Sequence, residues 1–160
     1  MGLSSAEQDI IDGIDPAVML RNTVRWAAIN SGTGNLTGLA QIAAELADAF
    51  APLPGHLTMA DPAPVEGIAA DSSARAVQHG RHLHLVVRPH APIQMLFTGH
   101  MDTVYPADHP FQTVAMRDDG TLGGPGTADM KGGLAVMLQA LQAVERSDSC
   151  LLYTSPSPRD

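Results

Sequence analysis

Residues 93–104 read IQMLFTGHMDTV, an apolar run that ends in a histidine and an aspartate on either side of one methionine. The apolar run, 93–98, predicts a buried strand, and His100 would then lie at the strand end, where α/β proteins bind ligands. In extended backbone, His100 and Asp102 point to the same side. A carboxylate so placed can hold one ring nitrogen of a histidine whose other nitrogen binds a metal. A strand-end histidine with a simple hydrogen bond is the alternative.

The rest of the chain alternates helical and strand patterns. Apolar residues at helical spacing predict three helices, at 16–29, 37–50 and 129–147. Short apolar runs predict further strands near 56–58 and at 82–87 and 112–117, with the remainder of 51–80 as loop. The short connection between 82–87 and 93–98 predicts antiparallel pairing of those two strands. This order of elements predicts an α/β fold, a three-layer sandwich with a mixed sheet.

A second polar segment, GPGTADMKGG at residues 124–133, opens the last predicted helix. The glycines let the backbone approach a ligand closely, and a carboxylate such as Asp129 suits the bridging of two divalent cations. A plain helix N-cap also explains Asp129. Nucleotide binding is a weaker alternative, because Asp129 stands where a dinucleotide fingerprint needs its third glycine. Lys131, the only lysine, has either a local role or simple solvent exposure.

Other histidines have structural explanations. His82 and His84 share one strand face and are predicted to be exposed, opposite an apolar face. His109 is predicted to be a loop residue.

Together, GHMDTVYP at 99–106 and GPGTADMKGGLA at 124–135 resemble the zinc aminoacylase and metallopeptidase family. That family includes acetylornithine deacetylase, succinyl-diaminopimelate desuccinylase and glutamate carboxypeptidase. The resemblance implies a hydrolase of amide or peptide bonds with two Zn²⁺ ions, for which Co²⁺ is a possible substitute. It implies that His100 is a ligand of one zinc, that Asp102 is the catalytic-site residue orienting His100, and that Asp129 bridges both ions.

The resemblance also implies a substrate and an assembly. The substrate would be a small N-acyl amino acid or a peptide, cleaved by a deacylase or an exopeptidase, and HMDTVYP favours the glutamate carboxypeptidase-like branch. The full-length form is expected to be a homodimer. The alternative is a non-catalytic relative that keeps the fold without a complete metal site.

Two ligands cannot fill two zinc sites, because each ion needs about four. We therefore expect a Glu–Glu pair, a later acid and a late histidine beyond residue 149, and we expect the 160-residue chain to lack hydrolase activity. Residues 1–149 would be the N-terminal part of a catalytic domain that is truncated at its C-terminal end. Residues 150–160, CLLYTSPSPRD, can be encoded by a transposon-based sequencing adapter and are predicted to be non-native. An ordinary Ser/Pro-rich terminus is the alternative.

The composition limits the classes of binding partner and the cellular compartment that we expect. The net charge of −8 argues against nucleic acid and anionic membrane surfaces. No apolar run reaches the length of a membrane span, no export signal is visible, and a single cysteine excludes an internal disulfide. These features predict a cytoplasmic protein.

Overall fold

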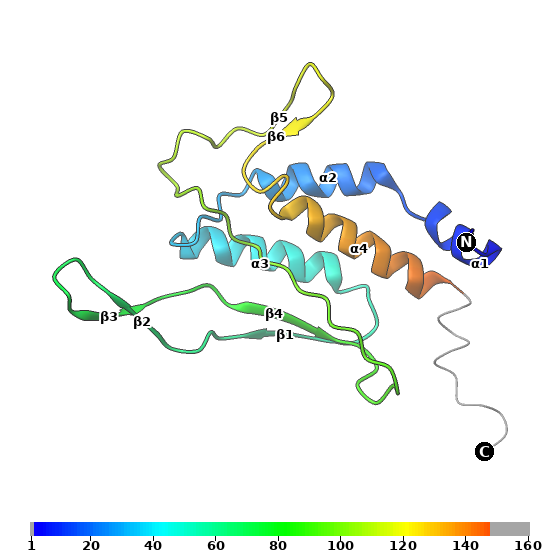
Figure 1. Ribbon diagram of the computed structural model, residues 1–160, viewed down its shortest axis with the longest axis horizontal. Helices are drawn as coiled ribbons and strands as arrows, with labels where there is room; N and C mark the ends of the chain where they lie inside the picture. The colour runs from blue at the N-terminus through cyan, green and yellow to red at the C-terminus, as the bar shows by residue number, and fades with distance from the viewer. Residues whose placement is uncertain (1, 148–160) are drawn as a thin grey trace.

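The computed structural model describes residues 2–147, which form an α/β structure of helices and small antiparallel sheets (Figure 1). The helices are α1 (Ser5–Asp12), α2 (Pro16–Ala27), α3 (Leu36–Phe50) and α4 (Lys131–Arg146). The strands are β1 (His56–Ala60), β2 (Val65–Ile68), β3 (Ala74–Val77), β4 (His82–Val86), β5 (Ala115–Met116) and β6 (Leu122–Gly123). Segment 150–160, predicted to be non-native, lies outside the described residues.

The hydrophobic core lies among α2, α3 and α4, which run side by side in Figure 1. The apolar stripe predicted for α3 is confirmed, because all of its members are buried: Leu39, Ile42, Ala43, Leu46 and Phe50. The helix predicted at 16–29 forms α2, but only part of its apolar spacing marks the buried face, since Ala27 is buried while Leu20 and Val24 are 43% and 39% exposed. α2 turns Trp26 inward instead, and this side chain is fully buried. An aromatic ring buries more apolar area than either aliphatic residue, so it decides which face packs.

Local capping sets the helix starts. Asp15 caps α2, and its carboxylate accepts a hydrogen bond from the Ala17 amide at 2.8 Å. The cap of α3 is Asn35, whose side chain accepts a hydrogen bond from the Gly38 amide at 3.1 Å. The helix therefore begins one residue earlier than its pattern indicated.

The helix α1 and the strands β2 and β3 were not predicted. α1 begins with a capping box in which Ser4 and Glu7 each accept a hydrogen bond from the other's backbone amide. β2 and β3 form a hairpin that projects away from the helices (Figure 1). At its turn, Asp71 accepts hydrogen bonds from the amide and hydroxyl of Ser73. Polar composition suggested a loop there, but local hydrogen bonds close a hairpin.

The segment 93–98 corrects the sequence prediction most clearly, because it forms no strand and does not pair with β4. Its side chains are exposed, with Leu96 at 88% and Ile93 at 80%. The connection before it is tied to α4, since Arg88 forms a two-pronged ion pair with Glu145 at 2.6 and 2.7 Å. This contact carries the chain away from the edge of β4, so the predicted hairpin does not close.

β1 and β4 form an antiparallel pair that lies against α3. Leu83 and Leu85 of β4 face the core and are half-buried, while His82 and His84 are exposed, as predicted. The strands of residues 2–147 form three separate two-stranded sheets, so no single mixed sheet joins them. A three-layer sandwich stays a prediction. Within the same residues, no helix is long and apolar enough to cross a membrane.

Candidate metal centre

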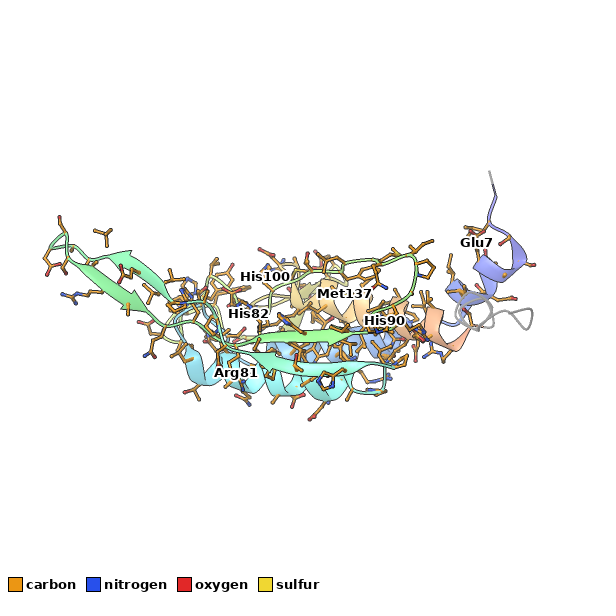
Figure 2. All side chains as sticks on the ribbon, turned by 90° about the horizontal axis from the view of Figure 1, so that it is seen from below. Glu7, Arg81, His82, His90, His100 and Met137 are labelled. Atoms are coloured by element: carbon orange, nitrogen blue, oxygen red, sulfur yellow. The ribbon has the colours of Figure 1, made fainter. Side chains whose placement is uncertain are left out.

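His100 lies on the extended chain that returns from the turn beyond His90, past Met137 of α4 (Figure 2). Its imidazole lies between two carboxylates. Nε2 is 2.9 Å from Oδ1 of Asp129, and Nδ1 is 3.1 Å from Oδ1 of Asp102 and also 3.1 Å from the Asp102 backbone carbonyl. The structure therefore brings together the three residues that the sequence singled out.

A polar loop after α2 holds the segment that carries Asp102. Gly32 and Thr103 form a parallel β-bridge, and the buried Ser31 hydroxyl donates to the Met101 carbonyl at 2.8 Å. The Thr33 hydroxyl donates to the other carboxylate oxygen of Asp102, Oδ2, at 2.6 Å. Both oxygens of Asp102 are therefore engaged, one by Thr33 and one by His100.

The sequence patterns give this loop, residues 31–35, no role beyond joining the predicted helices 16–29 and 37–50. A signal was present, because hydroxyl residues flank a glycine, and conformationally special loops of this kind often carry function. What the sequence could not show is that the loop lies beside residues 101–103. The Asn30 side chain strengthens that contact by donating to the Tyr105 carbonyl at 3.1 Å and to the Gln112 side chain at 2.8 Å.

Asp129 does not act as a helix cap. α4 begins at Lys131, its N-cap residue is Met130, and no side chain caps it. The peptide bond between Asp129 and Met130 is cis. The Asp129 side chain is 84% exposed, and within residues 2–147 its hydrogen-bond partner is His100, so its second oxygen faces solvent. The N-cap explanation of Asp129 is therefore wrong. Its carboxylate contacts His100 through one oxygen, and the other oxygen is accessible to a ligand.

Lys131 is fully buried, so simple solvent exposure is also wrong. Its ammonium group donates to the Ile29 carbonyl at 2.8 Å, which joins the start of α4 to the end of α2. Burial lowers the pKa of Lys131 from 10.5 to about 8. Its stem also packs on Gly126, where an added Cβ would lie 3.0 Å from the lysine Cδ. Lys131 thus fixes the position of the loop that precedes α4.

The electrostatics of His100 reflect its two carboxylates. Partial burial acts to lower the pKa of His100, but the hydrogen bond with Asp129 and the carbonyl and charge of Asp102 outweigh it, so the pKa is raised above 6.5. A metal ion would have to displace the proton from Nε2, because only a neutral imidazole binds metal.

The three side chains border a small hollow of about 150 Å³. Gly124 and Gly126 form part of its wall, with positive φ angles of 158° and 76°. A hollow this size suits a metal ion with water. Two carboxylates at its edge disfavour phosphate, which weakens the nucleotide alternative.

The donor set fits part of a zinc site. Zinc binds imidazole nitrogen and carboxylate oxygen at about 2.0–2.2 Å, so two tetrahedral ligand atoms lie about 3.3 Å apart. The 2.9 Å between His100 Nε2 and Asp129 Oδ1 needs only a small opening to match. Across residues 2–147, however, no group of three or more His, Cys, Asp or Glu residues is placed to hold an ion. His100 and Asp129 can supply two ligands, with Asp102 behind the histidine.

His109 lies in a loop, as predicted, where its Nδ1 accepts a hydrogen bond from the Phe111 amide at 3.0 Å. This contact gives His109 a structural explanation.

Comparison with known families adds one finding. The model of Peptidase family M20/M25/M40 matches residues 96–151. The matched range holds His100, Asp102 and Asp129, so it covers the same two segments from which the resemblance was drawn. It supports the broad family and a hydrolase class. No curated protein matches the chain.

Proposed function

We propose that this chain supplies part of the active site of a two-zinc hydrolase of amide or peptide bonds. The observation that carries the proposal is His100 held between Asp129, at 2.9 Å, and Asp102, at 3.1 Å, beside a polar hollow. Zinc bound there would supply Lewis acidity toward an amide carbonyl and would lower the pKa of its water to about 7.

Each of the three residues has a distinct task. Asp102 accepts the Nδ1 proton of His100, which fixes the tautomer and leaves the Nε2 lone pair for the metal. Asp129 offers one oxygen on the His100 side and a second, exposed oxygen that a second ion can take. Asp102 would thus orient a ligand, while His100 and Asp129 would be ligands themselves.

Two ligands are not enough for catalysis, because catalytic zinc sites use three protein ligands and an open position. We propose that the remaining ligands and the general base lie outside residues 2–147, in a three-layer catalytic domain. We also propose a cytoplasmic homodimer that cleaves a small N-acyl amino acid or a peptide, with a glutamate carboxypeptidase-like preference. A non-catalytic relative predicts the same fold without metal-dependent hydrolysis.

Cobalt binding to the chain tests the metal site. The visible spectrum of Co²⁺ reports its ligands, so we expect weak binding that His100→Gln and Asp129→Asn both abolish. His90→Gln is the matched control, since His90 lies at the far turn in Figure 2. Unchanged binding in both site variants would refute the site. Chelator-sensitive hydrolysis of N-acyl amino acids by the full-length protein separates the enzyme from the non-catalytic relative.

A further inference from the structure

We propose that Thr33 is a positioning residue of this site, which holds Asp102 so that Asp102 can orient His100. The inference rests on the proposed function, because it assigns a task toward the metal ligand. Nothing in the pattern of the two motifs points to Thr33, since it lies outside both of them and 69 residues before Asp102. The tertiary contact alone identifies it.

The contact is short and its direction is fixed. The Thr33 hydroxyl lies 2.6 Å from Oδ2 of Asp102, and an ionised carboxylate can only accept, so the hydroxyl donates. A second acceptor, the Thr103 carbonyl, lies farther away at 3.3 Å. Hydrogen bonds to a carboxylate are shorter and about twice as strong as those between neutral groups, so the Thr33 hydroxyl donates mainly to Asp102.

Thr33 acts on His100 through Asp102. With Oδ2 held by Thr33, the carboxylate plane of Asp102 cannot rotate freely, and Oδ1 stays 3.1 Å from His100 Nδ1. With both Oδ1 and the backbone carbonyl of Asp102 at 3.1 Å, Nδ1 keeps its proton, and Nε2 is left for a metal on the Asp129 side. The Asp102 side chain is 34% exposed, so without Thr33 water would compete for Oδ2 and the carboxylate would turn.

The backbone of the loop does not depend on the hydroxyl. The Thr33 amide donates to the Thr103 carbonyl at 3.1 Å, and the Thr103 amide donates to the Ser31 carbonyl at 2.9 Å. These bonds hold the loop beside residues 101–103 whatever side chain is present. Thr33→Val, which has the same shape, should therefore leave the fold intact and remove only the hydroxyl's contact to Asp102 and its longer one to the Thr103 carbonyl.

Two readouts test the assignment. In the metal-free chain at alkaline pH, side-chain ¹⁵N NMR of His100 reports its tautomer. Asp129 Oδ1 lies 2.9 Å from Nε2 and competes for the ring proton, so the comparison is made with Asp129→Ala in every chain. In that background we expect the Nδ1–H form with Thr33, a mixture of tautomers in Thr33→Val, and restoration in Thr33→Ser, which keeps the hydroxyl. In Co²⁺ titrations, Thr33→Val should weaken binding by about 3- to 10-fold, less than the loss typical for a direct partner of a ligand. Thr37→Val, on the exposed surface of α3, is the matched control and should behave like the unmodified chain.

Three results would overturn the assignment. The first is an unchanged tautomer in Thr33→Val. The second is a Thr33→Ser variant that behaves like Thr33→Val, because shape and not the hydroxyl would then matter. The third is an equal effect of Thr37→Val. If the unmodified chain binds no Co²⁺, the proposed function fails, but the tautomer measurement still decides the role of Thr33.

Discussion

Lys131 offers a sharp test of the structure, because it is the only lysine and its side chain is fully buried. The perturbation is Lys131→Met, which keeps an unbranched side chain and removes the amine that donates to the Ile29 carbonyl. Burial holds the pKa of Lys131 at about 8 in the folded state, against 10.5 for an ordinary lysine. That difference corresponds to about 3 kcal/mol between the two protonation states.

The sign follows from proton binding. Between pH 8 and 10.5 the unfolded lysine keeps its proton, while the folded one has lost it. The unfolded state then binds more protons, so the free energy of unfolding rises with pH across this window, by up to about 3 kcal/mol from this residue. Below pH 8 both states hold the proton and the contribution to the slope ends.

Urea unfolding at several pH values, followed by the fluorescence of the single, buried Trp26, gives the free energies. Subtracting the free energy of unfolding of Lys131→Met from that of the unmodified chain at each pH removes the contributions of all other titrating groups. We expect the unmodified chain to gain stability relative to the variant as pH rises through the window. Arg146→Met is the matched control, since Arg146 also donates to a carbonyl, that of Gly13 at 3.0 Å, but does not titrate there. Parallel curves for the unmodified chain and Lys131→Met would refute the burial argument.

Two further predictions concern the contacts that place the site. Glu145→Gln should lower the free energy of unfolding by about 1–2 kcal/mol, because it weakens the bidentate ion pair with Arg88. The two side chains are only partly exposed, Arg88 by 30% and Glu145 by 21%. A double-mutant cycle with Arg88→Met measures the coupling energy of the pair, and a coupling energy of zero would contradict the prediction. Gly32→Ala should cost at least about 2 kcal/mol, because its Cβ would overlap the Tyr105 carbonyl. Gly34→Ala, where nothing lies within 4 Å, should melt like the unmodified chain, and equal melting of both variants would contradict the packing.

The sequence predicted the parts of the fold that local physics controls. The apolar residues of α3 recur at helical spacing over about four turns, so they all lie on one face of the helix, and that face must pack against the core. The same holds for the alternation in β4, where Leu83 and Leu85 face inward and the histidines outward. The capping box of α1 is also a local feature, because it depends only on Ser4 and Glu7, three residues apart.

Segments whose partners are distant were not predictable in this way. The run 93–98 is as apolar as a buried strand, yet the pairing of Arg88 with Glu145 on α4 directs the chain elsewhere. In α2, the choice between the Trp26 face and the Leu20 face depends on what packs opposite. Neither choice is encoded in local spacing, because the competing faces have similar apolar content.

The same distinction between local and distant contacts applies to the candidate site. His100, Asp102 and Asp129 could be named from the sequence, because each lies in a short segment whose residue types suit metal chemistry. Only the tertiary structure places Asp129 at 2.9 Å from His100, buries Lys131, and sets Thr33 against Asp102. Residue types and spacing specify which donors are available, whereas contacts between distant segments depend on how the helices pack, and that packing decides which donors meet.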